Sequence, residues 1–91
     1  MARLTLFFPE KEKRASVYIE GHVPTRGHSY TLENEPGSTT GRTYIVTLVC
    51  QKLWPKKTYF PDAKDNEYIT GDHFEVMLAS AEDIRTGRVR L

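Results

Sequence analysis

Cysteine is almost absent from the chain, and so are long hydrophobic runs. The single thiol, Cys50, cannot form an internal disulfide, and it excludes a zinc site built mainly from thiolates. The longest apolar stretch, residues 44–50, is interrupted by Thr47 and is too short to cross a bilayer. Only five residues, 4–8, separate Arg3 from Pro9, too few for the apolar region of a secretory signal. We therefore expect a cytoplasmic protein with no membrane association.

The sequence also lacks a recognisable catalytic or cofactor motif. The glycines fall in neither standard phosphate-loop spacing, and His22, His28 and His73 match no familiar metal-ligand pattern. A nucleophile, a base and an orienting acid cannot be placed together from the sequence, although His28 or His73 as a general base stays an alternative. We expect a non-catalytic protein with no metal and no cofactor.

Length limits the size of the core. The chain has 91 residues, so a single β domain, 1–91, is expected. A domain of this size buries only about 60 to 65% of the surface that its unfolded chain exposes. Dimerisation or docking on a partner would add stability, and a homodimer is one possible state.

Charge is unevenly distributed along the chain although the net charge is only +1. Residues 1–61 carry nine basic and five acidic side chains, which gives +4. Residues 62–83 carry one basic and seven acidic side chains, which gives −6, and residues 84–91 add three arginines. Such blocks can give different faces opposite potentials, or they can serve only for solvation.

Alternating hydrophobicity predicts short β-strands in the first third of the chain. Residues 2–8 and residues 15–20 both alternate with a period of two, and the polar block 10–14 between them predicts a hairpin. Residues 21–27 contain proline and two glycines and predict a loop, after which residues 28–33 return to a strand-like pattern.

The middle of the chain contains the strongest predicted strand. Residues 34–41 have no hydrophobic side chain and predict a loop, whereas residues 42–51 are rich in β-branched residues. Their nearly continuous apolarity favours a central strand covered on both faces, with Cys50 as a small core residue. Residues 52–61 are bracketed by prolines, so any strand there is short or lies at an edge.

The last third of the chain predicts a hairpin and a helical turn. Residues 62–67 read as an acidic turn, and residues 68–78 read as a hairpin that passes through Gly71. Ser80 is a typical N-cap, Gly87 can end a short helix, and residues 88–91 alternate like a final strand. We therefore expect a mainly β fold, a small antiparallel β-barrel or sandwich, with one short C-terminal helical turn.

Aromatic and cationic side chains occur together in two segments of the chain. Aromatic rings can stack on bases, and cations neutralise phosphates, so this combination is typical of single-stranded nucleic-acid binding. The alternative is that Trp54 and Tyr59 are core or interface residues and that the lysines only keep the protein soluble. The candidate nucleic-acid-binding residues are Arg26, Tyr30, Lys52, Trp54, Lys56, Lys57 and Tyr59.

The acidic block supports a second hypothesis, which is protein binding. A solvated acidic rim is the simplest interpretation, and a surface that imitates a phosphate backbone is another. A compact inhibitor or adaptor, such as a phage-encoded blocker of a host defence complex, could dock through acidic and aromatic residues. The candidate partner-binding residues are Asp62, Asp65, Glu67 and Asp72.

Two segments resemble filamentous-phage single-stranded DNA-binding proteins. Residues 23–32 have a glycine followed, three residues on, by Tyr30 and a Thr-Leu pair. Residues 68–76 are similar to that family's glycine-containing turn into a strand that begins with an aromatic residue. The resemblance implies an OB-like five-stranded barrel, a symmetric dimer and sequence-tolerant binding, with Tyr30 as a stacking residue and Arg26 near the phosphates.

Overall fold

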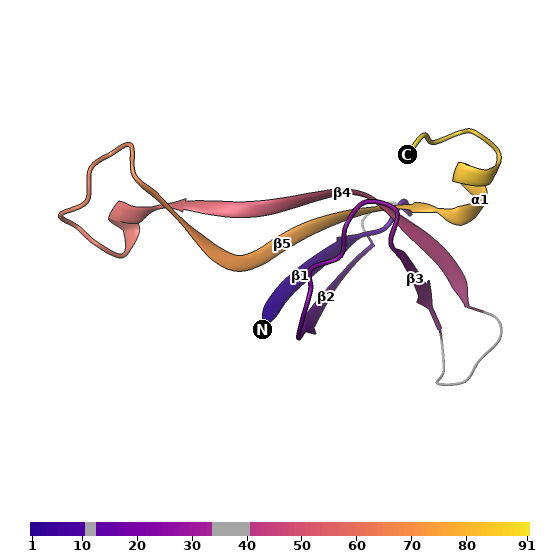
Figure 1. The fold of residues 1–91 in the computed structure, drawn as a ribbon, viewed down its shortest axis with the longest axis horizontal. Helices are drawn as coiled ribbons and strands as arrows, with labels where there is room; N and C mark the ends of the chain where they lie inside the picture. The colour runs from indigo at the N-terminus through magenta and orange to yellow at the C-terminus, as the bar shows by residue number, and fades with distance from the viewer. Residues whose placement is uncertain (11–12, 34–40) are drawn as a thin grey trace.

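A single five-stranded sheet, ordered β2-β1-β5-β4-β3, forms the framework of the protein (Figure 1). The computed structural model describes residues 1–10, 13–33 and 41–91, so most of the loop predicted at 34–41 lies outside the described residues. Neighbouring strands are antiparallel except for β1 and β5, which are parallel. The elements are β1 (Ala2–Phe7), β2 (Arg14–Ile19), β3 (Ser29–Leu32), β4 (Arg42–Pro55), the 3-10 turn η1 (Lys56–Thr58), β5 (Tyr68–Ser80) and α1 (Ala81–Arg85).

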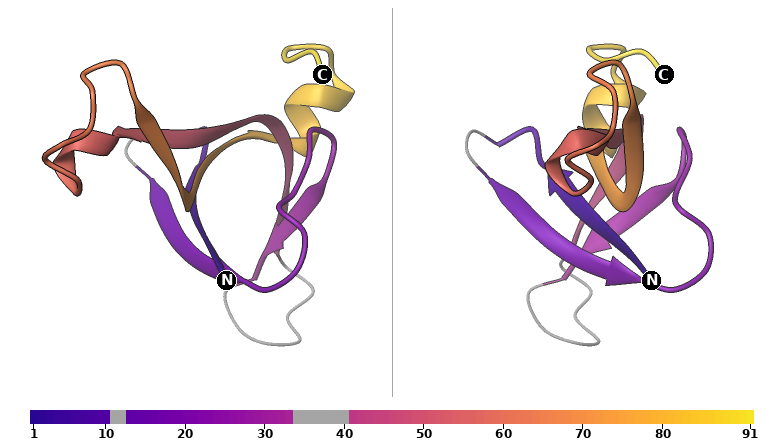
Figure 2. Two further views of the ribbon diagram at one scale, coloured as in Figure 1. Left: turned by 60° about the vertical axis from the view of Figure 1, so that its left-hand side comes forward. Right: turned by 90° about the vertical axis from the view of Figure 1, so that its left-hand side faces the viewer.

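The prediction of a mainly β fold with one short helix is confirmed. The mixed sheet curls into a half-barrel, which is consistent with a small OB-like fold (Figure 2). β1 and β2 form the predicted first hairpin, and β3 coincides with the strand predicted at residues 28–33. The described helices include none that is long and apolar enough to cross a membrane.

The core lies on the inner face of the curled sheet. Leu4, Leu6 and Phe8 alternate along the first strand and its end, as the period of two predicted. Tyr44 is only 1% exposed although it carries a hydroxyl group. The remaining buried members of the cluster are Val46, Val76 and Leu78, and the partly buried ones include Ala15, Val17, Ile19, Tyr30, Val49 and Phe74.

β4 and β5 extend beyond the rest of the sheet as a two-stranded arm, residues 52–72 (Figure 1). β1 pairs with β5 only from His73 onward, and β3 pairs with β4 only as far as Ile45. The molecule measures 53 × 30 × 25 Å, with a radius of gyration of 16.3 Å. A compact domain of this length has a radius of gyration of about 12 Å, so the arm makes the molecule unusually extended.

The arm corrects one sequence prediction and agrees with another. No turn interrupts β5 at Gly71, because the hairpin is closed instead by residues 56–67, which we call the tip. Residues 52–55 are the end of the long strand β4, and Leu53, Trp54 and Pro55 pair with β5 alone, so the expected edge position holds for them within the described structure. The acidic turn predicted at 62–67 lies in the tip.

A β-bulge at Thr47 corrects the prediction for the central strand. The register shifts between Val46 and Leu48, so the inner face is followed first by Tyr44 and Val46 and then by Val49. Leu48 and Cys50 consequently point to the outer face, where both are exposed. The buried residues of the strand, Tyr44 and Val46, lie on one face, so the predicted cover on both faces does not extend along it, and the prediction of Cys50 as a core residue is wrong.

The C-terminal helix begins as predicted, but the predicted final strand is absent. The Ser80 hydroxyl accepts a hydrogen bond from the Asp83 backbone N–H at 3.1 Å and caps α1. Gly87, at φ +80°, reverses the chain. The Arg88 and Val89 N–H groups then donate to the Asp83 carbonyl at 2.8 and 3.2 Å, so residues 88–91 fold back on the helix instead of pairing with the sheet.

One polar contact ties the turn after β1 to the core. The buried Tyr44 hydroxyl donates to Glu10 Oε1 at 2.6 Å, and Arg42 lies 3.5 Å from the same oxygen. This hydrogen bond, with a smaller contribution from Lys13 and Arg42, holds the pKa of the Glu10 carboxyl below its usual value. Burial, followed by the Glu10 contact, raises the pKa of Tyr44.

The lowered pKa of Glu10 predicts a loss of stability in acid. A carboxyl with a depressed folded-state pKa stabilises the fold above its unfolded pKa of 4.5, and that stability is lost as pH falls through the folded value. The free energy of unfolding in urea should therefore fall more for the wild type than for Glu10→Gln when the pH is lowered from neutral to about 3. Glu20→Gln, which does not touch Tyr44, is the control and should follow the wild type. Parallel curves for all three proteins would contradict the assignment.

Candidate nucleic-acid interface

The outer face of the sheet carries the side chains that alternate with the core. Because Leu4 and Leu6 point inward, Arg3, Thr5 and Phe7 point outward. Strand pairing extends this surface sideways into β2, β5 and β4. The cross-strand rows are Arg14–Phe7–Met77–Leu48, Ser16–Thr5–Glu75–Cys50 and Tyr18–Arg3–His73.

Aromatic and cationic side chains are interleaved on this outer face. Tyr18 is 65% exposed and lies opposite Arg3, whose other neighbour across the parallel ladder is His73. The Arg14 guanidinium lies 5.2 Å from the centre of the Phe7 ring, which is a cation–π contact. Among the described residues, no carboxylate lies within ion-pairing distance of Arg3 or Arg14. Among the described residues, the cross-strand neighbours of both arginines are instead aromatic side chains.

Trp54 and Lys52 continue the outer face onto the base of the arm. The Trp54 ring lies against Gly71, and its centroid is 6.4 Å from that of His73. The Lys52 ammonium pairs at 2.7 Å with Glu75, the one carboxylate in the three rows. The outer face thus offers four ring systems from four strands.

At the tip, the predicted cations and the predicted acids neutralise one another. Lys56 pairs with Glu67 at 3.2 Å and Lys57 with Asp65 at 2.9 Å. The Lys56 contact, with a backbone N–H from Lys64, holds the pKa of Glu67 below its usual value. Three lysines and three acids between residues 56 and 67 sum to zero charge. The hairpin therefore places basic residues of the 1–61 segment next to acidic residues of the 62–83 segment, so the two do not form separate charged faces.

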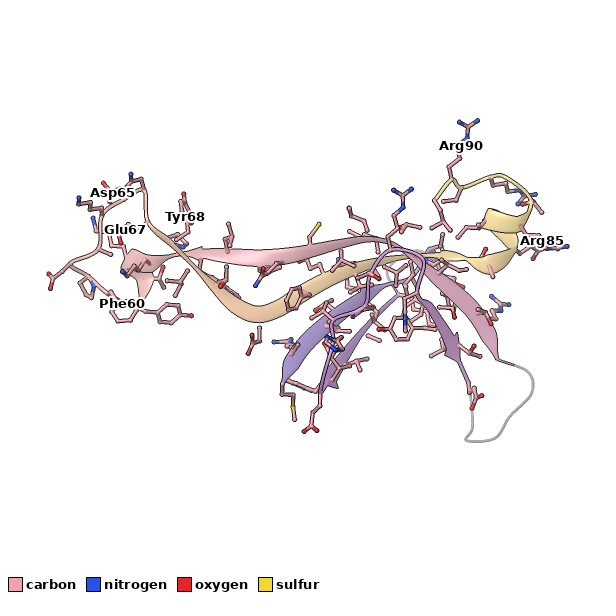
Figure 3. All side chains as sticks on the ribbon, viewed as in Figure 1. Phe60, Asp65, Glu67, Tyr68, Arg85 and Arg90 are labelled. Carbon is pink, nitrogen blue, oxygen red and sulfur yellow. The ribbon has the colours of Figure 1, made fainter. Side chains whose placement is uncertain are left out.

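Apolar side chains are exposed along the arm and at its tip. Leu53, Tyr59, Phe60 and Tyr68 are between 54% and 63% exposed. Figure 3 shows Phe60 and Tyr68 at the end of the molecule that is far from Arg85 and Arg90. We call the four exposed apolar side chains the apolar tip, which comprises Tyr59 and Phe60 of the tip together with Leu53 and Tyr68 of the adjoining strands. Ion-paired side chains lie beside them.

The predicted nucleic-acid-binding residues lie in four places. Lys52 and Trp54 belong to the outer face, whereas Lys56, Lys57 and Tyr59 belong to the tip. The other two predicted residues, Tyr30 and Arg26, lie on the body of the molecule.

Tyr30 and Arg26 are on different sides of the loop that precedes β3. Tyr30 packs against the core with its ring edge on His28, and burial raises its pKa. It is therefore half-buried on the inner side. Arg26 is exposed in a turn beside the edge of β4.

The predicted partner-binding acids are concentrated on the arm. Asp62, Asp65 and Glu67 lie in the tip, and Asp72 is exposed where the arm meets the body. Asp65 and Glu67 are paired with lysines. These residues do not form a separate acidic face.

The histidines gather no metal site in the described part of the chain. No group of three or more His, Cys, Asp or Glu side chains with suitable geometry occurs there. His73 Nε2 instead lies 3.0 Å from the Thr5 hydroxyl and helps to orient its ring on the outer face.

Sequence reasoning missed Arg3, Phe7 and Arg14 as site residues. The signal was present in the alternation that identified β1 and β2, because every residue that alternates with a core position must face the other side. Which rows these residues join depends on strand order and register.

No protein-family model, no curated protein and no solved structure matches the chain. The resemblance to filamentous-phage single-stranded DNA-binding proteins therefore stays a prediction from two segments of the sequence.

The contact between Trp54 and Gly71 predicts a specific sensitivity of the arm. A Cβ atom at position 71 would lie 2.5 Å from Cζ3 of the indole, so Gly71→Ala must displace the ring. We expect the unfolding free energy to fall by about 1 to 3 kcal/mol. We also expect a shift in the emission of Trp54, the single tryptophan. Asp72→Ala is the matched control, and equal spectra and stabilities for both variants would refute the contact.

Proposed function

We propose that the protein binds single-stranded nucleic acid on the outer face of its sheet, without catalysis and without a cofactor. The observation that supports this proposal most directly is the interleaving of aromatic rings with arginines on one open sheet surface. An open sheet that carries exposed aromatics is a recurrent platform for unpaired bases.

Tyr18 is the exposed ring of the outer face, and Phe7, His73 and Trp54 are half-buried rings on the neighbouring strands. Neighbouring strands lie about 4.8 Å apart, so Tyr18 on β2 and Trp54 on β4 are separated by two intervening strands. Phe7 and His73 occupy those strands. Each base that stacks on such a ring gains about 1 to 3 kcal/mol, and any base can do so. The surface therefore suits binding with little sequence preference.

Phosphate contacts favour the arginines of the body over the lysines of the tip. Arg3 and Arg14 have no carboxylate partner among the described residues, whereas Lys56 and Lys57 must release Glu67 and Asp65 to bind a phosphate. A guanidinium also stacks on rings while it donates to phosphate oxygens. The outer face is thus a better anionic-ligand site than the tip.

Variants of the outer face and of the tip test the location of binding. In fluorescence anisotropy with a labelled oligonucleotide, Tyr18→Ala should weaken binding by about five-fold or more, because one stacking surface is lost. Arg3→Ala combined with Arg14→Ala should reduce the slope of log K against log salt by about 1.4, since two phosphate contacts disappear. The controls Tyr59→Ala and Lys57→Ala, at the tip, should match the wild type.

Two results would count against this function. If the wild type binds no oligonucleotide at low salt, the proposed nucleic-acid-binding function is wrong. Loss of binding in the tip variants, with the outer-face variants unaffected, would move the site to the arm.

The apolar tip favours a second candidate function, which is docking on another protein. Interface centres are rich in aromatic residues and poor in unpaired charge. The tip exposes Tyr59 and Phe60, and four of its six charged side chains form two ion pairs. A two-stranded hairpin is only marginally stable by itself in water, so a protein that covered the arm would stabilise it. Under this proposal the chain acts as an inhibitor or adaptor, for example a phage-type inhibitor on a host protein complex.

Variants of the aromatic and acidic side chains test whether this surface docks on a protein or only keeps the chain soluble. In a pull-down, Phe60→Ser with Tyr68→Ser should lose a partner that the wild type retains, because the apolar contact is removed. Light scattering of the protein alone would show whether that partner is a second copy. Arg85→Ala, at the opposite end of the molecule, is the control. Asp62→Lys tests the acidic side chains separately, and retention of the partner by this variant would show that the acidic residue only keeps the tip soluble. An unchanged partner in the aromatic variant would exclude docking through the tip.

A further inference from the structure

The loop before β3 is built as a rigid turn against the edge of β4. The His28 N–H donates to the Thr25 carbonyl at 3.0 Å, and Gly27 at the third position has φ +95°. This combination is typical of a type II turn, which requires a positive φ at that position. Two further backbone hydrogen bonds, from Gly27 to Val46 at 2.9 Å and from Val46 to His28 at 2.8 Å, hold the turn on the strand.

A hollow of about 480 Å³ lies between this turn and β4. Its walls include the apolar side chains of Pro24, Leu48 and Val49, and Thr25 and Arg26 also line it. Pro24 is buried, so this wall of the hollow belongs to the folded body. Sites that hold small planar ligands are concave and mostly apolar, with a few polar groups, and the hollow has this composition.

Leu48 connects the hollow to the outer face. It lines the hollow and also ends the row that runs from Arg14 through Phe7 and Met77. The bulge at Thr47 is the reason, because it turns Leu48 outward at the point where the turn approaches β4. A ligand that crosses the outer face from β2 to β4 therefore reaches the hollow next.

We propose that the hollow is a nucleobase subsite, in which one base of the bound strand is held against Leu48 and Pro24. Arg26 then contacts the adjoining phosphate. This inference rests on the proposed nucleic-acid function and extends it with a specific pocket at one end of the site. An apolar wall accepts the face of any base, and the arginine supplies the charge that an anionic backbone requires.

The position of the hollow predicts a dependence on oligonucleotide length. Three inter-strand spacings separate β2 from β4, which places the hollow about 14 Å from Tyr18 when the path is followed along the curled sheet. A dinucleotide can occupy only part of the outer face, whereas a strand of about six nucleotides spans the outer face and the hollow. The contribution of the hollow should therefore appear only with the longer ligands.

A length series of oligothymidylates, from about two to about ten nucleotides, tests the subsite by anisotropy. Thr25→Phe fills the hollow and Arg26→Ala removes the charge. Both variants should bind the longer oligonucleotides about five-fold or more weakly than the wild type does, and their affinity for the shortest should be unchanged. Unchanged affinity for the shortest ligand also shows that each variant is folded. The control Arg85→Ala should match the wild type at every length.

The outcomes separate the subsite from the function on which it rests. If the wild type binds and Tyr18→Ala weakens every length while both hollow variants match the wild type, the subsite is wrong and the outer face stands. Equal weakening at all lengths by the hollow variants would also overturn the subsite. If the wild type binds no oligonucleotide, the proposed function itself fails.

Discussion

Pairing between β4 and β5 is the interaction on which the rest of the structure depends. The ladder runs from Tyr44 opposite Ser80 to Pro55 opposite Tyr68, with register shifts between Val46 and Leu48 and between Gln51 and Leu53, and it joins the core to the arm. Its irregularity at Thr47 is as important as its length, because the bulge reverses which face each later residue occupies. The same bulge therefore completes the inner core with Val49 and turns Leu48 to the outside.

The hairpin also decides the electrostatics of the molecule. It brings the acidic residues 65, 67 and 75 beside the basic residues 52, 56 and 57, so Lys52 pairs with Glu75 across the two strands, and Lys56 and Lys57 pair with Glu67 and Asp65 within the tip. Exposed ion pairs of this kind contribute little to stability, but they leave few free charges on the arm. Arg3 and Arg14 are paired across the sheet with aromatic residues instead. Arg3 and Arg14, which have no carboxylate partner among the described residues, therefore lie on the body and not on the arm.

Local sequence patterns predicted the strands more successfully than the surfaces. Alternation identified β1 and β2, and Ser80 and Gly87 marked the ends of the helix. The bulge and the length of the arm could not be predicted, because both arise from cross-strand register and not from the properties of one segment. For the same reason, the predicted stacking residues are divided among the outer face, the tip and the core, and Cys50 is exposed.

The two surfaces make different demands on a ligand, and their geometry separates them. The outer face, on which we propose that nucleic acid binds, is broad, cationic and supported by a packed core. The apolar tip is narrow, neutral and supported only by its own ladder, so it gains most from a partner that covers it. Trp54 and Gly71 lie between the two, where the outer face becomes the arm. Trp54 contacts His73 of the outer face and is paired with Ile69 of the arm, so a ligand that stacked on its ring would lie where the two surfaces meet.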